Sequence, residues 1–219
     1  MRVRKKKYIK ERLLMCGEIV IDNAVNLAGK WREIFNNDKR LVLEIGCGKG
    51  GFITKTALKN ADINFVAIEK IDDILVMAAE RAKSLFILNI RFAVFDASNL
   101  DKLFCENEVS LIYINFCDPW LEGKKRKRRL THSNYLEIYK KILTPKGEIH
   151  LKTDNKRLFD FSIFELQKSG FVLKNVSYDL HNSDYKDNIM TEYEEKFAEQ
   201  GLNIYRLEAV NSGEWTVES

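Results

Sequence analysis

The chain has 219 residues, of which 45% are hydrophobic and 31% charged, and this length predicts one domain with a core large enough to fold without disulfides or metals. The hydrophobic fraction excludes a wholly disordered chain, and no apolar run is long enough to span a membrane. The formal net charge is only +4, but residues 1–12 and residues 124–129 carry +6 each, so the rest of the chain is acidic.

The N-terminus, MRVRKKKYIKERL, is basic, and neither the apolar stretch nor the cleavage site of a secretory signal follows it. We expect residues 1–20 to form a basic arm, for which a flexible tail is an equal alternative, and residues 21–219 to form a single domain. The four cysteines form no C-x-x-C pair, and together with three scattered histidines they lack metal-ligand spacing. These features predict a cytoplasmic protein that holds no metal.

Beyond residue 40, short apolar runs alternate with segments of helical period. The runs predict seven strands at residues 41–45, 64–68, 90–95, 111–115, 147–152, 171–180 and 203–209. Amphipathic or capped segments predict helices at residues 69–88, 133–143, 153–169 and 191–201. This alternation predicts an α/β fold with a mostly parallel sheet and helices on both faces, in which the last strand could enter antiparallel. Ligands are then expected at the carboxyl ends of the strands.

Glycines follow the first predicted strand directly, in EIGCGKGG (44–51). Glycine lets the chain turn sharply and lets a ligand approach the backbone, so Gly46 and Gly48 are candidates for cofactor binding. Gly46, Gly48 and Gly51 also match the G-x-G-x-x-G pattern of dinucleotide sites. A tight strand-to-helix turn without a ligand is the alternative.

Three acids stand at successive strand ends: Glu44, Glu69 and Asp96. An ionised carboxylate only accepts hydrogen bonds, so Glu69 suits the hydroxyls of a ribose and Asp96 an adenine amino group. Glu44 suits a cationic amino-acid group, and S-adenosylmethionine carries all of these groups. Each acid could instead cap a helix or be solvated, and for Asp96 the two interpretations are about equal.

The fourth predicted strand ends at Asp118-Pro119-Trp120. A carboxylate beside an aromatic plane suits a purine, because guanine presents N1–H and N2–H to an acceptor. Such contacts would support the charge that N7 gains on alkylation, and N7 needs no general base because its lone pair is free. A buried turn with Asp118 as a helix cap and Trp120 in the core is the alternative.

Six bases follow this turn closely: Lys124, Lys125, Arg126, Lys127, Arg128 and Arg129. A run of like charge is usually solvated or disordered. Its position beside the Asp118 turn favours contact with a phosphate backbone.

At these residues the chain resembles the bacterial tRNA (guanine-N7)-methyltransferase family. The matching stretches run in order along most of the chain: EIGCGKG (44–50), AIEK (67–70), NIRF and DA within 89–97, IYINFCDPW (112–120), KRRLT (127–131), IHLKTDN (149–155), LFDFS (158–162), TEYEEKF (191–197) and IYRLEA (204–209). The resemblance implies a Rossmann-like class I SAM-dependent methyltransferase fold with seven strands, the last antiparallel. It also implies methylation of a guanosine in the variable loop of tRNA.

By the same resemblance, Glu44, Glu69, Asp96 and Asp118 bind S-adenosylmethionine or lie at the catalytic centre. The target nucleoside is bound by Asp154 and by the segment Thr191, Glu192, Tyr193 and Glu194. Without the resemblance, Asp154 is typical of a helix cap, and Glu192 and Glu194 of a solvated helix start.

The chain also departs from the family pattern. Cys117 stands where a proline is usual, and Leu121-Glu122-Gly123-Lys124 stands where Pro-Lys-Lys-Arg is frequent. The family's substrate-contacting lysine falls on Glu122, so that role is not assigned to it, and Lys124 or Lys125 is the candidate replacement.

Other functions remain as alternatives. A methyltransferase acting on a small molecule or a protein would not use the basic run, and a non-catalytic RNA-binding or scaffold protein would not bind S-adenosylmethionine. A dehydrogenase would leave Glu44 and the Asp118 turn without a role. The oligomeric state expected is a monomer or a homodimer.

Overall fold

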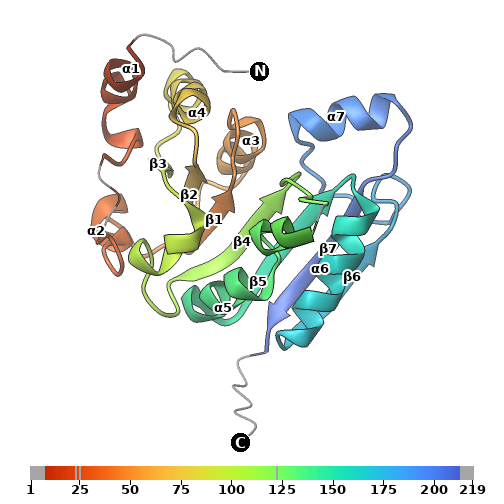
Figure 1. The fold of residues 1–219 in the computed structure, drawn as a ribbon. Coiled ribbons are helices and arrows are strands. Elements are labelled where there is room, and N and C mark those ends of the chain that lie inside the picture. The colour runs from red at the N-terminus through yellow and green to blue at the C-terminus, as the bar shows by residue number, and fades with distance from the viewer. Residues whose placement is uncertain (1–7, 23, 25, 122, 213–219) are drawn as a thin grey trace, which may run out of the picture.

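The computed structural model describes residues 8–22, 24, 26–121 and 123–212, and its centre is a seven-stranded sheet (Figure 1). The strand order is β3-β2-β1-β4-β5-β7-β6. The strands are β1 (Leu41–Ile45), β2 (Asn64–Glu69), β3 (Ile90–Val94), β4 (Val109–Asn115), β5 (Leu143–Thr153), β6 (Phe171–Ser177) and β7 (Tyr205–Asn211). β7 runs antiparallel to both β5 and β6, whereas the other pairs are parallel, which confirms the predicted mixed sheet.

Helices cover both faces of this sheet, as predicted. The α-helices are α1 (Ile9–Met15), α2 (Trp31–Phe35), α3 (Gly51–Lys59), α4 (Asp72–Ser84), α5 (Ser133–Ile142), α6 (Lys156–Lys168) and α7 (Glu192–Glu199). The 3-10 helices are η1 (Gly17–Ile19), η2 (Ala97–Lys102) and η3 (Gly123–Arg128). Residues of α2, α5 and α6 pack into the hydrophobic core on one face, and residues of α3 and α4 pack into the core on the other.

The central strands supply side chains to both cores. Leu43 and Ile45 of β1 belong to one core, and Val42 belongs to the other. This two-sided burial explains why these strands show no alternation of apolar and polar residues. The observed elements differ from the predicted ranges mainly by a few residues at their ends, where local signals are weakest.

The N-terminal elements pack against the free edge of the sheet. In α1, Arg12 donates through Nε and Nη2 to the carboxylate of Glu80 in α4, at 2.7 and 2.6 Å. Val20 forms a parallel bridge with Phe92 in β3. Part of the predicted arm is therefore packed, whereas residues 1–7 lie outside the described residues. Within the described ranges, no helix has both the length and the apolar character needed to cross a membrane.

Candidate functional site

Parallel pairing brings four strand ends to one edge of the sheet. Ile45 at the end of β1 lies opposite Ile68 in β2 and Ile114 in β4, and Glu69 lies opposite Val94 in β3. The acids predicted from the sequence therefore lie at neighbouring strand ends, around the loop that follows β1.

Glu44 is the most deeply placed of these acids, with 2% of its surface exposed. Its Oε1 accepts a hydrogen bond of 3.0 Å from Asn115 Nδ2 in β4, whereas its Oε2 has no partner among the described residues. Burial raises the pKa of Glu44 to about 7, against the smaller opposing effects of Asn115 and Lys152. A buried carboxylate with an unsatisfied oxygen can receive a cationic or hydrogen-bond-donating ligand group.

The raised pKa of Glu44 predicts a pH-dependent stability. Between pH 4.5 and about 7 the folded state holds a proton that the unfolded state has released, so this group destabilises the fold as the pH rises. We expect wild type to lose about 3 kcal/mol of unfolding free energy relative to Glu44→Gln between pH 4.5 and pH 8. Urea titrations at both pH values measure this, and a pH-independent difference between the two proteins would contradict it.

The glycine loop between β1 and α3 leaves open space at two positions. Gly46 and Gly48 have φ of +75° and +56°, and a Cβ added to either would meet no described atom within 4 Å. Gly50 differs, because a Cβ there would lie 2.7 Å from Ala78 Cβ. Glu69 braces this loop, since its Oε2 accepts from Gly48 N at 3.3 Å.

Asp96 follows β3 and forms the N-cap of η2. Its Oδ1 accepts from Ser98 N at 3.0 Å, and its Oδ2 pairs with Lys70 Nζ at 2.6 Å. The hydrogen bond from Lys70 is the main cause of the lowered pKa of Asp96. The helix-cap interpretation is therefore confirmed, and 35% of the side chain stays exposed.

The Asp118 turn is a strained segment at the end of β4. Phe116 and Trp120 have φ of +51° and +40°, a region that non-glycine residues rarely adopt. Asp118 between them is exposed. The side chain of Arg129 donates from Nε to Pro119 O at 2.8 Å and from Nη2 to Trp120 O at 3.4 Å, which fixes the turn.

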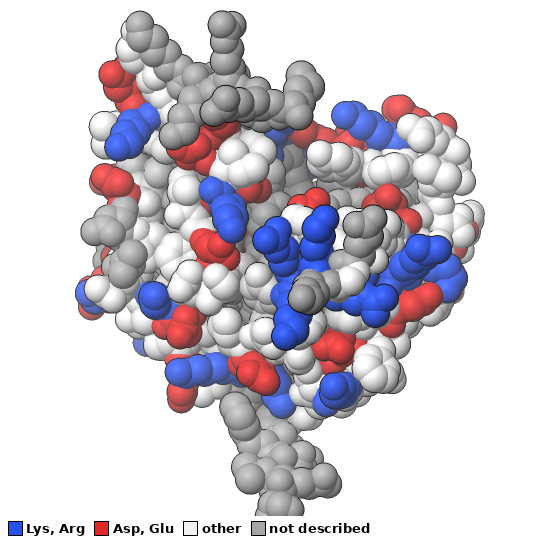
Figure 2. All heavy atoms as spheres, viewed as in Figure 1, with Lys and Arg blue, Asp and Glu red and all other residues white. Residues whose placement is uncertain are grey.

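The six-base run is not uniform. Lys125, Arg126, Lys127 and Arg128 are exposed on η3, and Arg128 lies over the Trp120 ring at 5.1 Å. Figure 2 shows Lys and Arg side chains gathered near the centre of the face in view, at the position of η3, the green 3-10 helix of Figure 1. The predicted phosphate contact of Arg129 is wrong, because this residue is only 5% exposed and its side chain binds the turn instead. Glu122 and the side chain of Lys124 lie outside the described residues.

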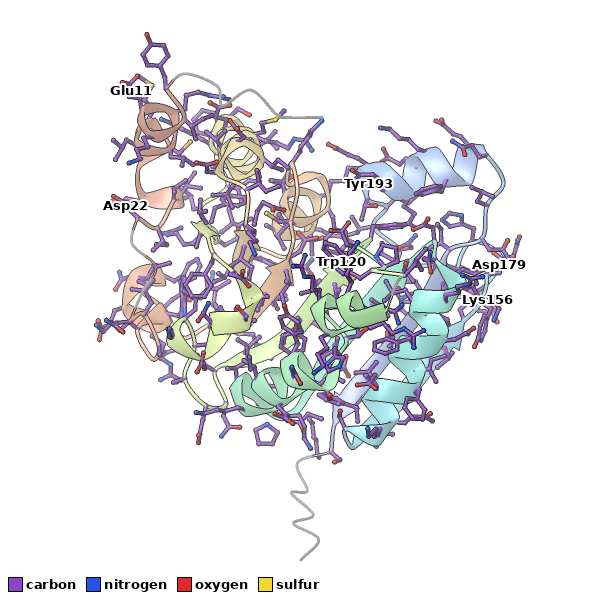
Figure 3. All side chains as sticks on the ribbon, in the orientation of Figure 1. Glu11, Asp22, Trp120, Lys156, Asp179 and Tyr193 are labelled. Atoms are coloured by element: carbon purple, nitrogen blue, oxygen red, sulfur yellow. The ribbon has the colours of Figure 1, made fainter. Side chains whose placement is uncertain are left out.

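The segment that begins α7 lies against this edge of the sheet. Phe116 stacks with Tyr193 and Phe197 at centroid distances of 6.3 and 6.2 Å, and Figure 3 shows Tyr193 at the inner end of α7, above Trp120. A Cβ added to Gly51 would lie 2.9 Å from Glu192 Cγ. The structure therefore brings the Thr191–Glu194 segment to the glycine loop.

Two interpretations made from the residues alone are wrong. Asp154 is exposed after β5 but does not cap α6, because Asn155 Oδ1 accepts from Leu158 N instead. Glu194 is not solvated: it is fully buried and forms a reciprocal capping box with Thr191. The predicted solvated helix start applies only to the partly exposed Glu192, which pairs with Arg81 at 2.6 Å.

Lys152 of β5 is a residue that the sequence interpretation missed. Its Nζ lies 2.6 Å from Glu194 Oε2 and 2.9 Å from Ile189 O, with 7% of the side chain exposed. His181 Nε2 lies 3.0 Å from the other Glu194 oxygen. The alternate residues of GEIHLK, namely Glu148, His150 and Lys152, are a polar series that could have indicated a polar face on this strand.

A small pocket of about 40 Å³ lies beside the site, lined by residues of the 185–189 segment and by Asn115, His150 and Lys152 among others. A larger pocket of about 560 Å³ lies between α1 and α4, and none of the predicted site residues lines it.

Comparisons with known proteins identify relatives of this chain. A family model described as a putative methyltransferase matches residues 38–207. A tRNA (guanine-N(7)-)-methyltransferase of Clostridioides difficile strain 630 is 48% identical over 210 residues, which are 95% of this chain and 98% of that protein. The chain belongs to the tRNA (guanine-N(7)-)-methyltransferase family.

A further member of the family, from Listeria monocytogenes serotype 4b strain F2365, is 46% identical over 209 residues, covering 95% of this chain and 98% of that protein. Among solved structures, the 16S rRNA methyltransferase KamB matches with a TM-score of 0.62 over 83% of this chain and 92% of its own, at 12% identity. At 12% identity this structural match shows the fold alone, and the predicted class I methyltransferase fold is confirmed.

Proposed function

We propose that the protein transfers a methyl group from S-adenosylmethionine to N7 of a guanosine in the variable loop of tRNA, forming 7-methylguanosine. The observation that carries this proposal is the exposed Asp118 carboxylate at the end of β4, next to the strand end that holds Glu44. The names of the relatives support the substrate and the product.

The residues at the strand ends fit S-adenosylmethionine. The unpartnered Oε2 of Glu44 suits a cationic group, and the open space at Gly46 and Gly48 lets a ligand reach the backbone. Glu69 and Asp96 take the ribose and the adenine. When bound, the cofactor supplies an electrophilic methyl group on a sulfonium centre.

Asp118 binds and orients the guanine base. Its carboxylate accepts hydrogen bonds from guanine N1–H and N2–H, which orients N7 and offsets the positive charge that develops there. Arg129 acts as a positioning residue, because its guanidinium donates to the Pro119 and Trp120 carbonyls and so fixes the turn that carries Asp118. Asp154 and the exposed Tyr193 contact the nucleoside, together with Glu192. Thr191 and Glu194 fix the backbone of that segment through their capping box.

The exposed bases of η3 hold the phosphate backbone of the RNA. Replacing Lys125, Arg126, Lys127 and Arg128 by glutamine should weaken tRNA binding and flatten the dependence of log K on log salt by about 0.7–0.9 for each phosphate that the variant no longer neutralises. Filter binding at several salt concentrations measures the slope. Glutamine at four exposed lysines outside the run, Lys102, Lys141, Lys168 and Lys174, is the matched control. An equal decrease of slope in both variants would mean that the bases of η3 make no specific phosphate contacts and are only a solvated surface.

The protein works in the cytoplasm, where its tRNA substrate is found, as a monomer or a homodimer. Isotope-labelled S-adenosylmethionine and total tRNA, incubated with the protein and digested to nucleosides, test the function. We expect the label in 7-methylguanosine alone. Binding of S-adenosylmethionine without label in that nucleoside would contradict the proposal.

A further inference from the structure

A second group of titratable side chains lies on one face of β5 and β7, away from the strand ends. His150 in β5 and Glu208 in β7 are direct register partners in the antiparallel pair. Glu148 precedes His150 by two residues, so the strand period places both side chains on the same face. None of these three residues is part of the proposed S-adenosylmethionine or nucleoside site.

The ligand atoms of this group converge. His150 Nε2 lies 2.7 Å from Glu148 Oε2 and 3.9 Å from Glu208 Oε1. All three residues offer atoms that lie within 4.8 Å of one another. In a tetrahedral zinc site, nitrogen and oxygen ligand atoms lie about 3.3 Å apart, given bonds of about 2.0–2.2 Å. The two observed distances lie on either side of that value.

We propose that Glu148, His150 and Glu208 bind one divalent transition-metal ion, with Zn²⁺ as the preferred ion. One imidazole nitrogen and two carboxylate oxygens are the donor set that zinc accepts, with water in the fourth position. Magnesium and calcium prefer oxygen ligands throughout, so the central histidine disfavours them. The proposal goes beyond methyl transfer and reverses the expectation of a metal-free chain.

The surroundings hold these ligands in place. Tyr113 packs edge-to-face on the His150 ring at a centroid distance of 5.5 Å. Glu208 Oε2 accepts from Asn175 Nδ2 at 2.6 Å, and Arg206 donates to Oε1. Hydrogen bonds of this kind orient ligating carboxylates.

An ion there would cross-link β5 to β7. Glu148 keeps 35% of its side chain exposed, which provides a route of entry. Because the ion binds the folded state alone, it should raise Tm by roughly 5–10 °C when free Zn²⁺ is 100-fold above Kd.

The test uses the full-length, untagged protein, stripped with a chelator and titrated with Zn²⁺ against a chromophoric competitor. We expect one equivalent to bind, and His150→Gln and Glu208→Gln to lose at least about 10-fold in affinity together with the rise in Tm. Glu148→Gln, at a half-exposed position, gives the same readout if either buried variant fails to fold.

Cys105→Ser is the matched control, because Cys105 is an exposed thiol outside the group that could bind zinc on its own. It should leave binding unchanged. Absence of a bound equivalent, full binding by all three glutamine variants, or loss of binding in Cys105→Ser would each overturn the proposal.

Discussion

Replacing Asp118 by asparagine should lower kcat for tRNA methylation by about 10²–10³, with a much smaller change in the melting temperature. The exposed carboxylate offers two acceptor oxygens to the two N–H groups of guanine, whereas the amide offers one acceptor and turns a donor toward a donor. The loss should appear in kcat, because the charge that Asp118 offsets develops only as N7 is alkylated. Steady-state kinetics at saturating S-adenosylmethionine measure it.

Asp101→Asn is the matched control for this substitution. Asp101 is an exposed aspartate in η2, outside the proposed site, and its replacement should leave kcat within about two-fold. If Asp118→Asn retained activity within a few-fold, Asp118 would not hold the base, and the assignment of its role would be wrong.

Replacing Lys152 by methionine should destabilise the fold by about 3–5 kcal/mol. The side chains of Lys152 and Glu194 are 7% and 0% exposed, and their ion pair is 2.6 Å long. Removal of the ammonium leaves a buried carboxylate whose remaining donors are Asn188, His181 and its own capping box. Burial raises the pKa of Glu194, but Lys152, Asn188 and His181 together hold it below its usual value, so it should move upward in this variant. Urea unfolding measures the loss of stability.

The surface pair of Lys156 and Asp160 supplies the comparison for this substitution. It has nearly the same length, 2.7 Å, but its side chains are 61% and 45% exposed. Lys156→Met should therefore cost much less stability than Lys152→Met, because water screens the exposed pair. Equal losses of unfolding free energy from Lys152→Met and Lys156→Met would mean that burial does not make the Lys152–Glu194 pair more important for stability than an exposed pair.

The fold could largely be predicted from the sequence because its signals are local. The run Leu41–Ile45 is short, apolar and followed by glycines, and the structure has a strand with those bounds. The acids at the ends of β1 and β2 and the acid after β3 could be placed at one edge, since parallel strands end together. The position of β7 between β5 and β6 could not be predicted, because only long-range pairing sets strand order.

The parts of the site that depend on distant contacts were not predictable. Lys152 and Glu194 are 42 residues apart, and neither shows by its neighbours that it will be buried. In the six-base run, Arg129 is chemically like the residues before it, yet it alone is buried among those that the structure describes there, because two carbonyls of the Asp118 turn receive its donors.

The most direct test of the central claim compares two transcripts of one substrate tRNA, an ordinary one and one made with 7-deazaguanosine, which carries carbon in place of N7. Both keep the N1–H and N2–H groups that Asp118 is proposed to bind, so both should bind the protein. We predict that the ordinary transcript gains labelled methyl groups and the 7-deaza transcript gains none. Equal labelling of the two transcripts would contradict attack by guanine N7.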